Sequence, residues 1–468
     1  MSGRIELRPG LLSMPEGLGE HRADAFEPMA RLLRAMMMRW DDAGIEWAVL
    51  RNADQLPDYT RYDVDVLVRK DGLKKLLSIT QEVAGGQGWR VAGRIQKRFY
   101  TCLMLQRGSM EDGLQFLPLD FFTALEFRGF HYLRVAEVLG ARVRTGRGVW
   151  TVPPPWDAAI TILKEWLPHG GLKENSRDAV QRMAGAYPEQ MADVLKRAVG
   201  DQAGGPLVEA ARGADWDRLP HIARPARSSI AALIDWCRAA VANIRHLFRP
   251  SLGMVVGLAG ADGSGKSTLA SELATRLYKR PFKGVRYIHG NMGILPRFRD
   301  IRAFVCRAIL RRPPPPASKE PEALKGMMRP VPAWKSMALA TYYAVDLSLA
   351  RLLIRRWRGQ WMLVIMDRSF YDYFYQLGHR RCPHGFLRIM TRLLPKPDFL
   401  FCLEGDPELI HDRKPELTVE EIRHEQEILA QLAESRPYAR RIDGRPGVEA
   451  MVASAEREIL RHWVEGRT

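Results

Sequence analysis

Residues 260–267 read Gly-Ala-Asp-Gly-Ser-Gly-Lys-Ser, which is a complete Walker A phosphate loop. An apolar run, Met254–Ala259, precedes the loop, and a segment with helical spacing, Thr268–Tyr278, follows it. This strand–loop–helix order is the context that the motif requires. The glycines let the backbone curl with its N–H groups pointing inward, so that no side chain blocks a triphosphate. The stretch predicts a nucleoside triphosphate site, and the alternative is a glycine-rich turn without a ligand.

Two side chains of the loop carry the expected chemistry. Lys266 can reach the β- and γ-phosphates, and Ser267 can hold Mg²⁺. The helix that begins here adds the positive end of its dipole. The residues expected to bind ATP are Gly260, Asp262, Gly263, Ser264, Gly265, Lys266, Ser267 and Thr268.

The composition is that of a globular protein with more than one domain. The chain has 468 residues, 46% of them hydrophobic and 27% charged, and a length of this kind favours two or three domains. The formal net charge of +17 favours anionic partners, or reflects an arginine-rich composition that maintains solubility. The basic residues are spread along the chain without interleaved aromatic residues, so no specific nucleic-acid binding is predicted.

The cysteines and the hydropathy of the chain bear on its cellular compartment. The five cysteines are scattered and form no Cys-x-x-Cys motif, which favours reduced thiols in the cytoplasm and argues against structural zinc. Met1–Glu27 lacks the apolar core of a signal peptide. The longest apolar stretch, Met337–Ile354, contains Asp346 and Arg351, so we expect a buried helix and no transmembrane segment.

The pattern of apolar runs divides the chain into three parts. Residues 251–468 alternate five strand candidates with helical segments, which predicts an α/β fold with a parallel sheet covered by helices on both faces. Residues 1–150 also read as α/β, and residues 151–250 as a helical connector. Within the connector, Ser228–Phe248 is a basic amphipathic segment that serves as a strut or makes peripheral contact with a membrane surface. The strand candidates are Met254–Ala259, Val285–His289, Met362–Met366, Phe399–Leu403 and Ala439–Asp443, and in the first part Ile45–Arg51, Val64–Val68, Phe99–Gln106 and Gln115–Phe122.

Further residues of the last part suit phosphoryl transfer. Asp367 and Arg368 directly follow a strand candidate, where the carboxylate can hold Mg²⁺ and the arginine can clamp a phosphate. Arg413 and Lys414 follow the next strand candidate and can close over the triphosphate, unless they form a solvated basic turn. The aromatic run 370–375 lines an acceptor pocket or belongs to the core, and Asp372 is its one acidic member.

Residues 254–463 resemble the thymidylate-kinase-like P-loop kinases. The resemblance is carried by the phosphate loop, Asp367-Arg368 with Asp372, the run 393–398, Arg413-Lys414-Pro415-Glu416-Leu417-Thr418, and Ile442-Asp443-Gly444. It implies a nucleoside-monophosphate-kinase type of fold, ATP and Mg²⁺ as cofactors, a small-molecule phosphate acceptor and a homodimer. Members that phosphorylate thymidylate usually carry an arginine after the second strand. Here Asn291 stands at that place, with Arg297 as a substitute, so the acceptor is dTMP or an intermediate of a surface-polysaccharide pathway.

Three carboxylates in the first part suggest a second site. Asp63 and Asp65 alternate on one strand and therefore share a face, and Asp120 ends another apolar run. Together they can hold Mg²⁺ for nucleotidyl transfer, or form a solvent-facing sheet edge. The layout resembles nucleotidyltransferase-like domains, although the Gly-Ser pair usual in active members is absent. The alternative function is thus a metal-dependent nucleotidyltransferase in which the phosphate loop is a nucleotide sensor, and a domain that only binds a nucleotide or glycan is a third.

Overall fold

The computed structural model describes residues 23–51, 53–60, 63–111, 113–127, 130–222, 234, 237–238, 241, 252–290, 292–296, 331–367, 370–376 and 379–465. The chain forms two compact units, one comprising Arg8–Ile244 and the other Arg245–Thr468 together with Met1–Leu7. The predicted segment Ser228–Phe248 lies almost wholly outside the described residues, as do Asn291, Arg297 and Arg368.

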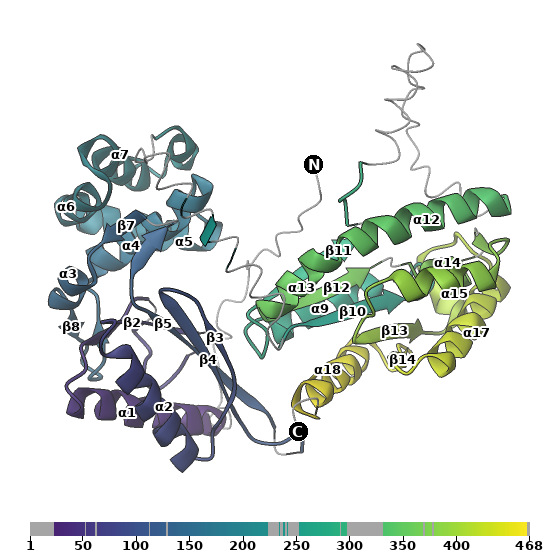
Figure 1. The fold of residues 1–468 in the computed structure, drawn as a ribbon, viewed down its shortest axis with the longest axis horizontal. Coiled ribbons are helices and arrows are strands. Elements are labelled where there is room, and N and C mark those ends of the chain that lie inside the picture. Colours follow the sequence, from purple (N-terminus) through teal and green to yellow (C-terminus); the bar gives the residue numbers. More distant parts are fainter. Residues whose placement is uncertain are drawn as a thin grey trace, which may run out of the picture. The chain divides into compact units, whose positions relative to one another are not determined.

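The second unit contains a five-stranded parallel sheet with the order β11-β12-β10-β13-β14 (Figure 1). All five predicted strands are confirmed. The three central strands are apolar runs, which is typical of parallel strands that are buried on both faces, whereas the two edge strands are partly exposed. The strands are β10 (Met254–Ala259), β11 (Gly284–His289), β12 (Met362–Asp367), β13 (Phe399–Glu404) and β14 (Ala439–Asp443).

Helices cover both faces of this sheet, as predicted. Helices α9 and α18 pack on each other on one face. On the other face, side chains from α12, α13, α14, α15 and α17 form one core with alternate residues of β10, β12 and β13. The helices are α9 (Lys266–Leu277), α12 (Ala333–Leu349), α13 (Arg351–Gly359), α14 (Asp372–Tyr375), α15 (His384–Leu393), α16 (Pro407–Arg413), α17 (Val419–Ser435) and α18 (Val448–Glu465).

One expectation for this unit needs correction. The stretch Met337–Ile354 was predicted to be a buried helix, but it spans α12 and α13, which meet at Ala350, and one side of it is exposed. Val345 is 44% exposed and Leu349 is 54% exposed. Among the described residues no single helix has the length and hydropathy to cross a bilayer, whereas the bent pair α12–α13 meets both criteria when taken together.

The first unit is built on a mixed seven-stranded sheet with the order β3-β4-β5-β2-β1-β9-β8 (Figure 1). Strands β2 and β5 are parallel neighbours, whereas β4 is antiparallel to β3 and β5. The prediction missed β3, whose side chains are mostly exposed or half-buried. The strands are β1 (Trp47–Val49), β2 (Val64–Val68), β3 (Arg90–Gln96), β4 (Tyr100–Arg107), β5 (Gln115–Phe122), β8 (Val143–Arg144) and β9 (Trp150–Thr151), with a separate hairpin of β6 (Leu125–Phe127) and β7 (Phe130–Leu133).

Two hydrophobic cores flank this sheet. One joins α1 and α2 to the strands around Trp40 and Trp47, and the other joins the helices after residue 153 to the strands around Leu67. The helices that were predicted as a connector therefore share a core with the sheet. They are α4 (Pro154–His169), α5 (Glu174–Ala186), α6 (Pro188–Val199), α7 (Asp201–Arg212) and a 3-10 turn (Trp216–His221), and the remaining helices of the unit are α1 (Ala23–Asp42), α2 (Leu73–Gly86) and α3 (Val135–Gly140).

Candidate functional site

The phosphate loop joins the fully buried strand β10 to α9 and depends on three glycines. Gly263 and Gly265 have φ of +94° and +93°, which side-chain-bearing residues rarely adopt. A Cβ on Gly260 would lie 2.6 Å from Ser264 Oγ and 3.1 Å from Leu403 Cβ. Each of the three glycines therefore meets a conformational or steric need of this loop.

The side chain of Lys266 lies inside this loop. It is 7% exposed, and its Nζ donates to the carbonyl oxygens of Gly260 (2.7 Å) and Ala261 (2.9 Å). Nζ also lies 3.2 Å from Asp262 Oδ1. The ammonium group is thus positioned by the loop itself.

A second lysine reaches the loop from the end of α16. Lys414 Nζ lies 3.2 Å from Asp262 Oδ2 and 3.2 Å from Glu416 Oε1, so Asp262 bridges Lys414 and Lys266. Burial disfavours the charged form of Lys414, but attraction to Asp262 and Glu416 outweighs it and raises the pKa of this ammonium group. Arg413, the neighbouring predicted residue, is exposed at the end of α16.

Asp367 ends β12 beside the loop and is 1% exposed. Its Oδ2 accepts hydrogen bonds from Ser267 Oγ (3.3 Å) and Tyr287 Oη (2.6 Å), and His289 Nδ1 lies 3.4 Å away. Within the described part of the chain, the buried Oδ1 has no hydrogen-bond partner. Ser264 Oγ is likewise buried without a partner there.

The aromatic run after β12 contributes mainly to the core, and one member supports the loop. Tyr375 is fully buried, and its hydroxyl accepts from the N–H of Gly260 (3.1 Å) and donates to Asp372 Oδ1 (2.9 Å). Burial raises the pKa of Tyr375 far above its ordinary value, so the hydroxyl stays protonated. Asp372, the predicted member, therefore acts on the loop through Tyr375, a contact that the sequence analysis did not identify.

A carboxylate on α12 holds the loop that follows β11. Asp346 is 1% exposed and accepts three backbone N–H groups, with Oδ2 bonded to Met292 (2.6 Å) and Gly293 (3.2 Å) and Oδ1 bonded to Leu295 (2.8 Å). The only sequence signal for this role is an aspartate in the middle of an apolar stretch. Asp346 fixes the segment at which the resemblance places the acceptor phosphate.

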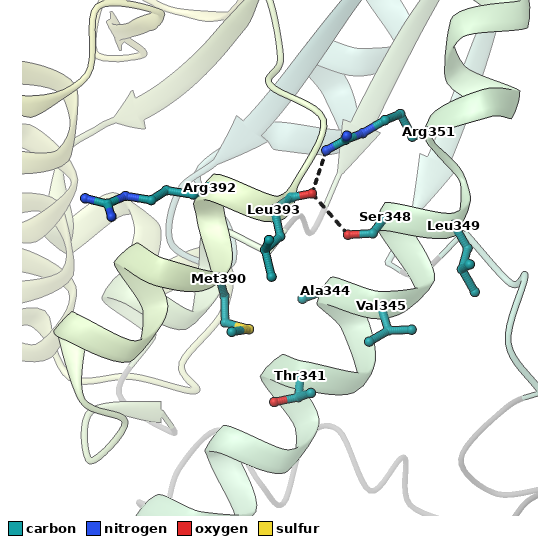
Figure 2. A pocket seen from close by; sticks show the side chains of 9 residues that line it. All are labelled: Thr341, Ala344, Val345, Ser348, Leu349, Arg351, Met390, Arg392 and Leu393. Atoms are coloured by element: carbon teal, nitrogen blue, oxygen red, sulfur yellow. Dashed lines mark hydrogen bonds between the residues drawn. The ribbon is translucent and has the colours of Figure 1, made fainter.

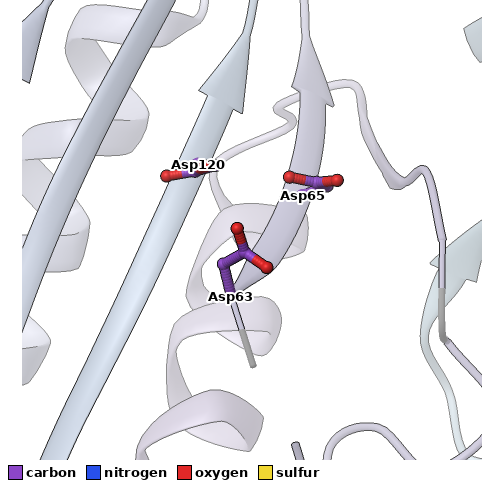
Figure 3. Close-up of side chains that lie close together, drawn as sticks. All are labelled: Asp63, Asp65 and Asp120. Carbon is purple, nitrogen blue, oxygen red and sulfur yellow. The ribbon is translucent and has the colours of Figure 1, made fainter. Parts of the chain in front are cut away.

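In the first unit, the structure brings the three predicted carboxylates together (Figure 3). Asp63, Asp65 and Asp120 each offer an oxygen atom, and these atoms lie within 4.8 Å of one another. Asp65 and Asp120 are register partners on β2 and β5. Three carboxylates are suitable ligands for a hard divalent cation.

Two basic side chains also reach this cluster. Arg51 donates to Asp65 Oδ2 through Nε (2.9 Å) and through Nη2, and Lys164 Nζ lies 3.4 Å from the same oxygen. Nearby, burial raises the pKa of Asp157 to about 6, although Arg51 opposes the shift. The negative charge of Asp65 is thus already compensated by its ion pairs with Arg51 and Lys164.

Comparisons with known proteins find similarity to solved structures. No family model matches the chain, and no curated protein matches it. Its structure is similar to that of thymidylate kinase from Ehrlichia chaffeensis, with 17% sequence identity and a TM-score of 0.28, over 45% of this chain and 98% of that one.

Proposed function

We propose that the second unit is an ATP-dependent phosphotransferase of the nucleoside-monophosphate-kinase type, acting in the cytoplasm on a small-molecule phosphate acceptor. The proposal is carried by one observation: a phosphate loop whose Ser267 hydroxyl is bonded to Asp367, a buried carboxylate with one unpartnered oxygen. An unpartnered buried oxygen costs about 1–3 kcal/mol, so Asp367 Oδ1 suits a ligand such as Mg²⁺ or its coordinated water.

Each residue of the site then has a role. The backbone of 260–265 and Lys266 bind the β- and γ-phosphates, and Ser267 with Asp367 holds Mg²⁺. A metal ion held by these two residues would supply neutralisation of the charge on the phosphates. Asp262 keeps the ammonium group of Lys414 at the loop (3.2 Å) and helps to raise its pKa. Positioning and charge neutralisation supply most of the catalysis in this kind of reaction.

The acceptor is the finer part of the proposal. Arg368 and the segment 292–295, which Asp346 holds, are assigned to the acceptor, and Arg413 to closure over the triphosphate. Either dTMP or an intermediate of a surface-polysaccharide pathway suits these roles.

ATP consumption by the full chain, measured against a panel of nucleoside monophosphates and sugar phosphates, tests the proposal. Lys266→Ala should lower turnover by about 100-fold or more while leaving the unfolding temperature within a few degrees. Lys74→Ala, which removes an exposed lysine of α2 in the other unit, is the matched control and should leave turnover unchanged. Normal turnover by a folded Lys266→Ala protein would rule out this assignment.

The carboxylate cluster supports a second candidate, nucleotidyl transfer by the first unit. The close approach of Asp63, Asp65 and Asp120 favours it, whereas the ion pairs of Arg51 and Lys164 with Asp65 compete with a divalent cation. Mass spectrometry of acceptors separates the candidates, since a kinase adds a phosphate and a nucleotidyltransferase adds a nucleotide. Asp63→Asn combined with Asp65→Asn should abolish only the second product.

A further inference from the structure

Helix α12 exposes a continuous uncharged stripe. Its exposed residues include Trp334, Ala338, Thr341, Val345 and Leu349, which recur every three or four positions and therefore share one side of the helix. Trp334 is 71% exposed, although α12 is otherwise packed on the sheet. We call these residues, together with the exposed Leu352 at the start of α13, the α12 stripe.

Helix α15 extends the apolar surface. Ile389 and Leu393, one turn apart, are 56% and 55% exposed. Val345 and Leu349 on α12 and Leu393 on α15 are among the residues that line a pocket of about 490 Å³. Figure 2 shows these residues on the two helices. Arg351 and Ser348 both donate to the carbonyl oxygen of Leu393, at 2.7 and 3.2 Å, and thereby fix the end of α15 against α12.

The charges around this surface are all of one sign. Within 333–394 the sequence contains three acidic residues, Asp346, Asp367 and Asp372, and all three are buried. The exposed charged residues of α12, α13 and α15 are basic: Lys335, Arg351, Arg355, Arg356, Arg388 and Arg392. An apolar stripe is thus accompanied by exposed cations with no exposed carboxylate on the same helices.

We propose that this surface of α12, α13 and α15 docks on an anionic lipid bilayer. Exposed Leu, Ile, Val and Trp side chains can enter the boundary between headgroups and acyl chains while arginines contact anionic headgroups. A second copy of the chain is a poorer partner, because two such faces would bring like charges together. Nucleic acid is also poorer, since the stripe is mostly aliphatic and offers one aromatic side chain for stacking. The proposal is independent of the reaction assigned above.

The test is flotation of the full chain with phosphatidylcholine vesicles, with and without phosphatidylglycerol. The wild-type protein should float with the anionic vesicles and dissociate as salt is raised. Arg388→Gln with Arg392→Gln should weaken the partition coefficient by roughly 20- to 30-fold, because each cation near such a surface contributes on the order of fivefold. Leu349→Ser with Leu393→Ser should also weaken it, at unchanged charge.

Arg182→Gln with Arg212→Gln is the matched control, since it removes two exposed arginines from the first unit. This variant should bind like the wild type, which would show that position matters and not net charge alone. Three outcomes would overturn the proposal. The first is equal flotation of the wild type with neutral vesicles, and the second is full vesicle binding by both surface variants, which would assign the contact to 228–248. The third is a wild-type protein that binds no vesicles but forms a dimer, if Leu349→Ser with Leu393→Ser dissociates that dimer.

Discussion

The role assigned to Asp346 makes a prediction that can be worked out bond by bond. Asp346→Asn keeps the shape of the side chain but leaves one acceptor oxygen in place of two. The smallest loss arises if the amide nitrogen replaces Oδ1, because Oδ2 serves both Met292 and Gly293, whereas Oδ1 serves only Leu295. We therefore expect the N–H of Leu295 to lose its acceptor and to face an N–H donor.

A hydrogen bond to a charged acceptor contributes about 1.5–3 kcal/mol. If the segment opens locally, hydrogen exchange of the Leu295 amide should accelerate roughly 10- to 100-fold, since each 1.4 kcal/mol is a factor of ten. The amides of Met292 and Gly293 should change less. In the kinase assay the acceptor KM should rise while the KM for ATP stays constant, because Asp346 contacts the segment 292–295 that we propose binds the acceptor.

Asp398→Asn is the matched comparison. The carboxylate of Asp398 accepts from the N–H of Val255 (2.7 Å) and from Arg358 Nη2 (2.9 Å), so its loss should affect protection at Val255 and not at Leu295. Unchanged exchange at Leu295 in folded Asp346→Asn protein would refute the reasoning. Equal acceleration at Val255 and Leu295 would do so too, because it would indicate global destabilisation.

Three other changes have defined outcomes. Gly263→Ala forces a side chain into φ +94° with its Cβ 3.1 Å from Ile410 O, so we expect a loss of about 1–2 kcal/mol in urea unfolding and weaker ATP binding by calorimetry. Tyr375→Phe leaves the N–H of Gly260 without its hydroxyl acceptor and should cost about 1–3 kcal/mol, measured as a lower Tm. The pKa of Asp157 is raised by burial to about 6, so the folded state holds a proton that the unfolded state releases near pH 4. Stability should therefore fall as pH rises from about 4 to about 6, and Asp157→Asn should flatten that part of the urea-unfolding profile.

The parallel sheet of the second unit was predictable because its signal is local. β10 and β14 have the predicted bounds, and the other three strands differ by one residue at an end. The central strands β10, β12 and β13 are apolar runs, which need no knowledge of their neighbours to be identified. The edge strands β11 and β14 are partly exposed and have a weaker local signal. β3 has no such run, since Arg90–Gln96 is mostly exposed or half-buried and forms an edge of its sheet.

The residues of the candidate site were also predictable where their signal is local, and not where their contacts join distant parts of the chain. Residues 260–268 are adjacent in sequence, and the motif names them together. The contacts of Tyr375 with Gly260 and of Asp346 with Leu295 join positions 115 and 51 residues apart, so no local pattern encodes them. The sequence does show one unusual feature, an aspartate within the apolar stretch 337–354. A buried carboxylate needs hydrogen-bond donors, which explains why this one accepts from the backbone.

The same stretch also explains why its burial was predicted wrongly. Apolar residues that face a core and apolar residues that face a partner have the same hydropathy, so only the fold separates Ala344, which is 2% exposed, from Val345, which is 44% exposed. Asp346 follows directly, about 100° further round the helix, and accepts hydrogen bonds from the segment 292–295. α12 therefore carries the proposed lipid contact and the proposed support of the acceptor segment on different sides of one helix. The two roles are separable: Leu349→Ser with Leu393→Ser should spare turnover of a soluble acceptor, and Asp346→Asn should spare vesicle binding. If either variant loses both properties while remaining folded, the assignment of separate roles to the two sides of α12 is wrong.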